Sequence, residues 1–596
     1  PPRPFPPNWA MRRTRAEGAH VRREVTDILI LGGGGAALYA ALRARDADSR
    51  LRIVVASKGL FGKSGCTRMV QGGYNVVLHP DDSFDKHYDD TLRGGAMIND
   101  QELAWLLVTQ APERIVELEN RFGCYFDRNV DGTIHQRALA GQSFNRTVHR
   151  GDLTGIELMT RLSEQVLVRD IDIRNEVRGV DLLFDAHRER VCGALLFDIN
   201  RGEYVAIAAR GVLLATGGAA PLYRITPASL EKSGDGLAMA FRAGAELIDM
   251  EMMQFHPTGL IAGDSVLTGT VLEEGLRGAG GYLLNAQGER FMARYDPAKM
   301  ERSTRDRVSR SSFLELRAGR GTPQGGVLLD VRHLGKEFLL KSSPGMYRRC
   351  LSVGYDMAKE PVQVTPTAHF QMGGVRIDTR CRSSIPGLYA AGEDAGGVHG
   401  ANRLGGNGVA ESIVFGAIAG DAMVRDLPSL ASPTPELGDV DDPLRAPPGT
   451  TNAFALRREL GNVAWDSIGI VRSAAALDDA LERLDAIEAR LADVALPGEI
   501  AGNPALQARM DIANLVTVAR LVATSATLRE ESRGSHYRED FPQTSPNGLY
   551  NIHLRRGVDG AIVTERRAVR FTRRRPEDLA GDTLIPTAPS TAAAAT

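Results

Sequence analysis

Apolar and glycine-rich segments alternate at the start of the chain. Residues 28–31 are all apolar, residues 32–35 are all glycine, and residues 38–43 continue with the composition of a helix. A second apolar run, residues 51–56, follows at the distance expected of a strand, helix, strand unit. Glycine at such a turn lets the backbone approach a pyrophosphate at the N-terminus of the helix. The pattern therefore predicts a dinucleotide-binding unit.

Two further apolar segments end in glycine far along the chain, at residues 211–218 and 387–393. Strand ends that converge on one nucleotide from distant parts of a sequence are expected when an inserted domain interrupts a dinucleotide domain. We therefore predict an α/β fold in which residues 24–259 and 361–430 form a Rossmann-like domain. Residues 260–360 are expected to form an inserted α+β capping domain.

The C-terminal third of the chain has a different pattern. Residues 433–448 are rich in Pro and Asp, and helical periodicity with many Ala, Leu and Arg follows at 477–496. We predict a helical domain over residues 449–542 and short strands in a C-terminal domain over residues 543–580. The low complexity of residues 581–596 predicts a disordered tail.

The composition is that of a globular protein without a strong overall charge. The 596 residues are 43% hydrophobic and 24% charged, and 72 Lys and Arg against 74 Asp and Glu give a net charge of −2. This balance excludes a disordered protein and provides no general attraction to nucleic acid. No apolar stretch approaches the roughly 20 residues that cross a bilayer. The basic arm at residues 1–23 lacks the apolar segment of a secretory signal, and we interpret it as solvated.

Metal and disulfide chemistry are not indicated by the sequence. The five cysteines lie far apart with no C-x-x-C pair, so neither a structural zinc site nor a redox dithiol is expected. This usage favours a reduced, cytoplasmic protein. No pair of His or carboxylate residues at helical spacing recurs with a third metal ligand. We interpret five histidines as structural: His20, His79, His87, His135 and His149.

Six motifs occur in one order along the chain. They are Phe255-His256-Pro257-Thr258-Gly259, Glu274-Gly275-Leu276-Arg277-Gly278, Arg305-Asp306-Arg307-Val308-Ser309-Arg310, Pro366-Thr367-Ala368-His369-Phe370-Gln371-Met372-Gly373-Gly374, His399-Gly400-Ala401-Asn402-Arg403-Leu404-Gly405-Gly406-Asn407 and Glu531-Ser532-Arg533-Gly534-Ser535-His536-Tyr537-Arg538. Together they resemble the flavoprotein subunits of succinate dehydrogenase and fumarate reductase and their relative L-aspartate oxidase. The resemblance covers about residues 25–545, and it implies that the dinucleotide is FAD.

The resemblance implies how a four-carbon dicarboxylate would be held beside the flavin. Hydride transfer at flavin N5 needs both carboxylates clamped and a proton delivered on the opposite face. Clamping requires charge-assisted hydrogen bonds, because each carboxylate loses hydration when it binds. By similarity, His256, His369 and Arg403 supply them.

The proton donor by similarity is Arg305, with Glu274 and Arg277 as its relay. Arginine is an unusual general acid because its pKa lies above about 12. A buried chain of Arg, Glu and Arg can nevertheless pass a proton in a concerted way, and its positive field polarises the substrate. All three positions of the relay are present in this sequence.

The FAD site implied by the resemblance draws on several segments. Ser57 stands where an acidic ribose ligand is common, which leaves that contact unassigned. The candidate cofactor-binding residues are Gly32, Gly34, Gly35, Ala37, Ser57, Lys58, Ser64, Cys66, Thr67, Gln71, Gly72, Gly73, Ala215, Thr216, Gly217, Gly218, Asp235, Glu393, Asn407 and Gly408.

Cys66 departs from the respiratory members of the family. There a histidine that precedes the Gln-Gly-Gly turn bonds covalently to the flavin, and counting back from Gln71 places Cys66 at that position. A histidyl link cannot form, so we expect noncovalent FAD, as in L-aspartate oxidase. A thioether to Cys66 is the alternative. The resemblance implies that loss of a covalent link lowers the flavin potential and favours reduction of an alkene.

Two further departures concern the substrate. Leu139 occupies the place of a Glu that meets the substrate ammonium in L-aspartate oxidase, which favours a substrate without an amine because that charge would lack a partner. Glu273 replaces the usual Thr and would repel a substrate carboxylate. Either Glu273 turns away and Thr268 or Thr270 makes the contact, or the ligand bears an amine or a positive charge.

These features lead to three hypotheses. The first is an FAD-dependent oxidoreductase, in the cytosol or at the inner face of the cell membrane, that interconverts succinate and fumarate, or a similar dicarboxylate, and exchanges electrons with an iron–sulfur subunit. The second is an amino-acid oxidase of the L-aspartate oxidase type, which would release hydrogen peroxide. The third is a flavin-bearing subunit that relays electrons without acting on a small acid.

Overall fold

In the computed structural model, residues 21–139, 141–431 and 449–579 are described. Most of the predicted basic arm, the Pro- and Asp-rich segment and the C-terminal tail lie outside these residues. Among the described helices, none has the length and apolar character needed to cross a membrane.

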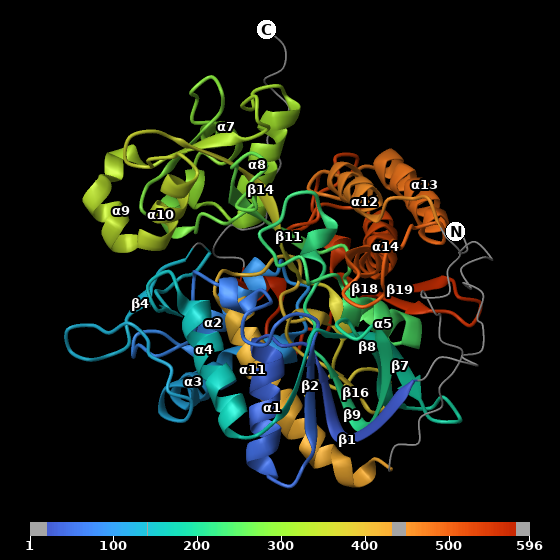
Figure 1. Cartoon of the computed structure of the whole chain (residues 1–596). Helices are drawn as coiled ribbons and strands as arrows, with labels where there is room; N and C mark the ends of the chain where they lie inside the picture. Colours follow the sequence, from blue (N-terminus) through green and yellow to red (C-terminus); the bar gives the residue numbers. More distant parts are fainter. Residues whose placement is uncertain (1–20, 140, 432–448, 580–596) are drawn as a thin grey trace.

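A seven-stranded mixed sheet forms the centre of the nucleotide-binding domain (Figure 1). Its spatial order is β6, β2, β1, β9, β8, β7, and the short strand β16 also pairs with β9. The strands are β1 (Arg22–Leu31), β2 (Ile53–Ser57), β6 (Asp172–Asn175), β7 (Val177–Phe184), β8 (Val191–Asp198), β9 (Glu203–Leu214) and β16 (Leu388–Ala390).

Three strand ends meet at one edge of this sheet, which confirms the predicted α/β arrangement. Strand β1 pairs in parallel with β9, and Leu31 lies opposite Leu214. Strand β16 pairs in parallel with the same end of β9, and Ala390 lies opposite Leu214. Ligands bind beyond the carboxyl ends of parallel strands, so this edge is where a nucleotide is expected.

Helix α1 (Gly35–Ala47) begins directly after the glycine turn and packs against α11 (Asn407–Asp426). Glycine residues on α11 allow this close approach, because a Cβ at Gly416 or Gly420 would lie 2.7 Å or 2.5 Å from the carbonyl oxygens of Ala36 and Ala40. The two helices lie side by side and pack against strands of the main sheet (Figure 1). The other helices of this region are α2 (Phe84–Gly94), α3 (Gln101–Asn120), α4 (Thr154–Val168) and α5 (Asp235–Ala243).

The inserted segment has its own sheet and its own hydrophobic core. The sheet order is β11 (Met253–Leu260), β14 (Val362–Gln371), β13 (Val327–Asp330) and β12 (Tyr282–Leu284). Its apolar core runs from Leu260 to Val364 and is separate from the main core. We call this segment the cap; it forms the yellow-green lobe in Figure 1. Its helices are α6 (Gly275–Gly278), α7 (Met292–Tyr295), α8 (Arg305–Arg317), α9 (Lys336–Ser342) and α10 (Pro344–Ser352).

Three long helices follow, in the region predicted to be helical. Their N-termini carry capping side chains: Ser473 accepts from the Ala476 N–H, and Asn503 accepts from the first turn of α14. The helices are α12 (Ala453–Ser467), α13 (Ala474–Leu491) and α14 (Pro504–Leu528).

Two small sheets complete the fold. Strands β18 (Tyr550–Arg556) and β19 (Ile562–Ala568) form a hairpin that joins β10 (Leu247–Ile248), β15 (Gly374–Arg376) and β17 (Ala395–Gly396). The other sheet contains β3 (Tyr74–Asn75), β5 (Thr147–Val148) and β4 (Gln136–Arg137). The C-terminal hairpin is thus attached to the nucleotide-binding domain.

Candidate active site

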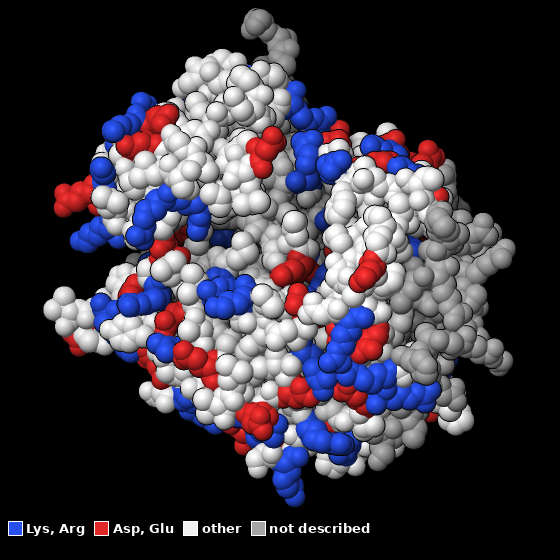
Figure 2. Space-filling view, in the orientation of Figure 1, with Lys and Arg blue, Asp and Glu red and all other residues white. Residues whose placement is uncertain are grey.

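A cavity of about 570 Å³ runs from the glycine turn of β1 to the underside of the cap. It is lined by Gly32 at one end and by His256, Arg305 and Arg403 at the other. Figure 2 shows the surface hollowed between the cap and the nucleotide-binding domain below it. The cavity therefore joins the predicted dinucleotide site to the predicted substrate site.

The glycine turn fits its role by conformation and by space. Gly32 has φ of +124°, and a Cβ there would lie 2.0 Å from the carbonyl oxygen of Ala215. The turn after β9 lies beside it, where Asp394 accepts from the backbone N–H groups of Thr216 and Gly217. Only glycine fits between these two turns.

Lys58 and Asp235 lie in a buried network of charges at the same end of the cavity. Lys58 Nζ contacts Asp235 Oδ2 at 3.2 Å and also reaches Asp511 of α14. Burial alone would raise the pKa of Asp235, but Arg178 and Lys58 hold it below its usual range. The network ties α14 to the nucleotide-binding domain.

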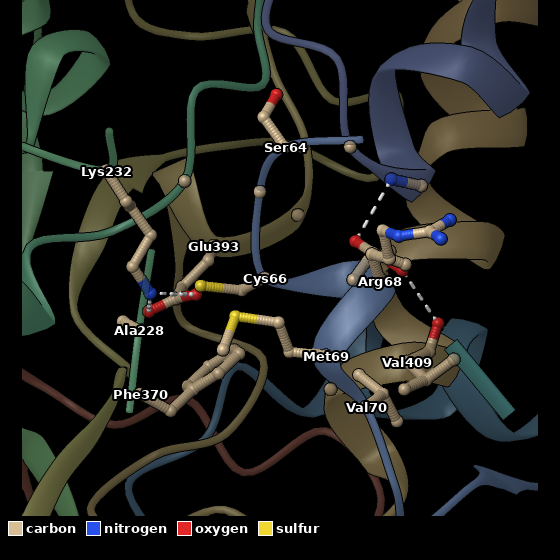
Figure 3. Close-up of a pocket in the computed structure, with 18 of the residues that line it drawn as sticks. Ser64, Cys66, Arg68, Met69, Val70, Ala228, Lys232, Phe370, Glu393 and Val409 are labelled. Atoms are coloured by element: carbon tan, nitrogen blue, oxygen red, sulfur yellow. Dashed lines mark hydrogen bonds and ion pairs between the residues drawn. The ribbon is translucent and has the colours of Figure 1, made fainter. Parts of the chain in front are cut away.

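Cys66 faces Lys232 and Glu393 in the middle of the cavity (Figure 3). Lys232 Nζ donates to both oxygens of Glu393 at 2.8 Å. Burial would lower the pKa of Lys232, but Cys66 and Glu393 raise it. The thiol thus lies beside a buried ion pair.

Most candidate cofactor residues line this one cavity. Three lie outside its lining: Ala37 is fully buried in α1, Gly218 packs against Glu393, and Asn407 donates and accepts within a network with Asn75, His87 and Thr91. The lining residues are Gly32, Gly34, Gly35, Ser57, Lys58, Ser64, Cys66, Thr67, Gln71, Gly72, Gly73, Ala215, Thr216, Gly217, Asp235, Glu393 and Gly408.

The pairing of β11 with β14 brings His256 and His369 together. His256 lies opposite Thr367 in the sheet, and the two imidazole centroids are 5.5 Å apart. Burial, followed by the positive charge of Arg305, lowers the pKa of both histidines well below 6.5. Nε2 of His256 and Nδ1 of His369 have no hydrogen-bond partner among the described residues. Both are therefore neutral imidazoles that offer a free nitrogen to a ligand.

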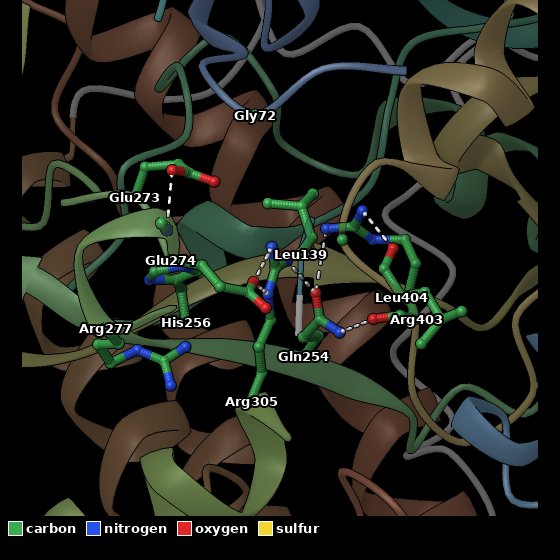
Figure 4. Close-up of polar contacts among 12 residues, drawn as sticks. Gly72, Leu139, Gln254, His256, Glu273, Glu274, Arg277, Arg305, Arg403 and Leu404 are labelled. Carbon is green, nitrogen blue, oxygen red and sulfur yellow. Dashed lines mark hydrogen bonds and ion pairs between the residues drawn. The ribbon is translucent and has the colours of Figure 1, made fainter. Parts of the chain in front are cut away.

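Gln254 joins the two arginines of the site (Figure 4). Its Oε1 accepts from Arg305 Nη1 and from Arg403 Nη2, each at 3.0 Å. Its Nε2 donates to Asn402 Oδ1 and to the carbonyl of Arg403, each at 2.7 Å. Arg403 also lies over the ring of Phe370 at 4.4 Å. One amide thus sets the positions of both guanidinium groups.

The three residues of the predicted relay are only partly connected. Arg305 Nε and Nη2 contact Glu274 Oε2 at 2.8 Å and 2.7 Å. Arg277 donates instead to the backbone carbonyl of Glu301, and its Nε and Nη2 have no hydrogen-bond partner in the described part of the chain. Arg277 still interacts electrostatically with Glu274. The ion pair next to the cavity is therefore formed, whereas the interaction shown between Arg277 and Glu274 is electrostatic.

The positions of Thr268 and Glu273 differ from the alternative in which Glu273 turns away and Thr268 contacts the substrate. The Thr268 hydroxyl donates to the Gly263 carbonyl at 2.7 Å in a turn at the cap surface, and the residue is not among those that line the cavity. Glu273 lines it, together with Thr270 and Leu139. The Thr268 side chain is used to close its own turn, so Thr270 is the threonine available to a ligand.

Comparison with known proteins assigns the chain to a family. Residues 27–409 match the FAD binding domain family, and residues 457–578 match the fumarate reductase flavoprotein C-terminal family. The chain belongs to the succinate dehydrogenase and fumarate reductase flavoprotein family. The recognition made from the six motifs is confirmed.

The flavoprotein relatives match over nearly their whole length. One subunit of the CoM/CoB fumarate reductase of Methanothermobacter marburgensis is 43% identical, with 90% of this chain and 98% of the relative covered. The L-aspartate oxidase of Synechocystis sp. is 36% identical, with 87% and 95% covered. A solved structure of the E. coli quinol fumarate reductase flavoprotein has a TM-score of 0.87 at 32% identity, with 93% and 98% covered.

The cavity of this flavoprotein fits an FAD on its own geometry. The glycine turn opens at the N-terminus of α1, where backbone N–H groups attract a pyrophosphate. The opposite end holds unpartnered polar atoms, including Oε1 of Gln71 and Nε of Arg403. Unpartnered polar atoms are costly when buried, so both ends are suited to a long polar ligand.

Three residues of the flavoprotein site were missed in the sequence. Gln254 lies in an apolar strand directly before the Phe-His-Pro motif, and its polar character was the available signal. Lys232 and Arg349 line the cavity from a loop and from α10, and neither belongs to a motif. Of the histidines interpreted as structural, His135 bonds to His149 at 2.7 Å, away from the cavity lining.

Proposed function

We propose that this flavoprotein interconverts succinate and fumarate, or a similar dicarboxylate, with noncovalently bound FAD. The observation that carries the proposal is the convergence of His256, His369, Arg403 and Arg305 at one end of a cavity whose other end fits a dinucleotide. Bound FAD would supply hydride chemistry at its flavin ring. The direction we propose is reduction of the alkene, because Cys66 stands where respiratory relatives form a histidyl bond.

The groups around the cavity suit a dianion. His256 and His369 offer neutral nitrogens, and Arg403 and Arg305 offer fixed guanidinium groups. Burial and the neighbouring Arg305 lower the pKa of Arg403. Solvent does not stabilise the positive charge of this guanidinium, so an incoming carboxylate would stabilise it. Arg305 would hold the proton for the substrate carbon, and Glu274 would fix the guanidinium in position.

The electron partner we propose is an iron–sulfur subunit. The E. coli relative belongs to a quinol fumarate reductase, and the Methanothermobacter relative is named as one subunit of its enzyme. These names describe complexes, and they support a complex for this chain. Co-purification of a protein with iron–sulfur absorbance would support the partner, whereas a chain that elutes alone from its native extract would oppose it.

A spectroscopic titration tests the function. The oxidised holoenzyme should change its flavin absorbance with fumarate, and dithionite-reduced viologen dye should be oxidised on addition of fumarate. Peroxide release from L-aspartate in air would instead support the amino-acid oxidase alternative. Leu139 opposes that alternative, because an ammonium beside it would lose hydration without a partner. Bound FAD without any response to these acids would support the electron-relay alternative.

A further inference from the structure

Glu273 is a carboxylate inside the substrate end of the cavity that the reaction as derived does not use. The residue is 6% exposed and lines the cavity. Its Oε2 accepts from the Gly275 backbone N–H at 2.9 Å, whereas its Oε1 has no hydrogen-bond partner in the described part of the chain. A buried carboxylate oxygen without a donor is unfavourable, so a ligand or a proton is needed to satisfy it.

The free oxygen lies on the same wall as the proton donor. A Cβ at Gly72 would lie 3.7 Å from Glu273 Oε1 and 3.9 Å from Leu139 Cδ1. A Cβ at Gly405 would lie 3.1 Å from the same Leu139 carbon and 2.9 Å from Arg305 Nη2. Leu139 thus adjoins both glycines, and Glu273, Leu139 and Arg305 line the same cavity (Figure 4).

Of the neighbouring cations, Arg305 is engaged, whereas Arg277 and Arg349 keep unpartnered nitrogens among the described residues. Arg305 donates to Glu274 and Gln254, and Arg277 donates to the Glu301 carbonyl. Arg277 and Glu273 still interact electrostatically. On α10, Arg349 also lines the cavity, and its Nη1 is unpartnered among the described residues. The titratable and charged groups that line this end are Arg305 on α8, Arg349 on α10, Asp152 before α4, His256 on β11, His369 on β14 and Arg403 on the loop before α11. Arg277 and Glu274, on the segment of Glu273, lie behind them and interact electrostatically with each other.

We propose that Glu273 binds the substrate as a carboxylic acid, so that binding of a dicarboxylate dianion takes up one proton from solution. The inference rests on the proposed function. The proton forms an O–H bond at Glu273 Oε1, no bond of the substrate breaks, and the complex gains a charge-assisted hydrogen bond to a substrate carboxylate. The side chain has little freedom to turn away, because Gly275 holds its other oxygen and the wall at Gly72 adjoins it.

The sign of the pH dependence follows from linkage. A complex that holds one more proton than the free protein is favoured at low pH and weakens as pH rises. We expect the Kd for fumarate to rise as the pH rises, by up to about tenfold per pH unit where one proton is taken up. The histidines do not contribute this proton, because burial keeps the pKa of His256 and His369 well below 6.5.

The test measures binding and proton uptake together on oxidised holoenzyme, where fumarate binds without turnover. Fumarate is titrated while flavin absorbance reports occupancy and a pH indicator in weak buffer reports protons. The expected result is about one proton per fumarate for the unmodified protein. Glu273→Gln, which keeps a permanent donor, should bind fumarate with no proton uptake and no pH slope. Glu337→Gln, at an exposed position of the cap, is the matched control and should behave as the unmodified protein.

Each result decides the question. Saturable binding without proton uptake would overturn the role of Glu273 while leaving the proposed function intact, and would point to Arg349 as the neutralising group. Uptake of a proton that persists in Glu273→Gln would also overturn it. Glu273→Thr, with matched FAD content, separates loss of the acid from damage to the site, and it should bind without uptake. Absence of any spectral response to fumarate would overturn the proposed function and this inference with it.

Discussion

Glu274 holds Arg305 through two nitrogens of one guanidinium, at 2.8 Å from Nε and 2.7 Å from Nη2. The pair is buried, with Glu274 3% and Arg305 9% exposed. Such a two-point contact fixes the plane of the guanidinium and leaves Nη1 for Gln254. The guanidinium that we propose as proton donor is thereby held in one orientation.

Replacement of Arg305 should stop the reaction without loss of the cofactor. Arg305→Ala is expected to retain FAD and to lower kcat by a factor of about 10²–10⁴ or more, because the positioned proton donor is removed. Reduced-dye oxidation by fumarate measures the activity, and flavin absorbance measures the cofactor. Arg317→Ala, on the exposed end of the same helix, should leave both unchanged. Near-normal turnover in Arg305→Ala would require another proton donor.

Gln254 should act as a positioning residue for both arginines. Gln254→Leu removes the oxygen that Arg305 and Arg403 share, so we expect kcat to fall and KM to rise, each by at least about tenfold, from a loss of about 1.5–3 kcal/mol per hydrogen bond to a charged group. Gln254→Glu should restore the acceptor and recover part of KM. Equal loss in both variants would indicate a general packing defect instead.

The flavin should leave the protein on acid denaturation. Among the described residues that line the cavity, Cys66 is the only cysteine. If FAD is held without a covalent bond, precipitated protein should be colourless, and Cys66→Ser should keep its full FAD content. Yellow colour that remains with the denatured protein, and is lost in Cys66→Ser, would demonstrate a thioether.

Gly32 should not tolerate a side chain. Its φ of +124° and the 2.0 Å approach of the Ala215 oxygen mean that Gly32→Ala must displace the turn, at a cost of about 3 kcal/mol or more. We expect loss of FAD binding and a clear drop in Tm. Gly288→Ala, at positive φ but with no atom near its Cβ, should cost only about 1–2 kcal/mol and keep FAD. Normal FAD content in Gly32→Ala would contradict the predicted turn.

Acid should destabilise the fold through buried histidines. Burial lowers the pKa of His87 from 6.5 to about 3, so below pH 6.5 the unfolded chain binds a proton that the folded chain does not. The stability that neutral His87 contributes is present above pH 6.5 and is lost as pH falls toward 3. The free energy of unfolding then decreases by roughly 1.4 kcal/mol per pH unit. Urea unfolding of the holoprotein at pH 7.5 and 5.5 should show a smaller difference for His87→Gln than for the exposed control His79→Gln. Equal stability differences in the two variants would show that His87 is not a source of the acid destabilisation.

The parts of the fold that local sequence controls were predictable. The glycine turn after β1, the strand ends of β9 and β16, and the helical periodicity that marks α13 all depend on neighbouring residues. The motifs also predicted that His256 and His369 lie together. They do so because β11 and β14 each carry one of the two histidines and pair directly.

Contacts between distant segments were not predictable from those patterns. Gln254 meets Arg403 only because the loop before α11 crosses β11, and the two residues are 149 positions apart. Thr268 was named for its hydroxyl, yet a bond to Gly263 within five residues uses that group. Arg277 has the expected position in the sequence, but its hydrogen bond goes to a backbone carbonyl that no motif marks.

The cap carries Glu274, Arg277 and Arg305 on a hydrophobic core of its own, whereas Arg403 lies on the loop before α11 in the nucleotide-binding domain. Any tilt of the cap would withdraw Arg305 and leave Arg403 in place. A dicarboxylate could then dock in an open molecule but could not be protonated there. The moment of proton transfer would thus depend on the orientation of the cap rather than on the intrinsic acidity of Arg305.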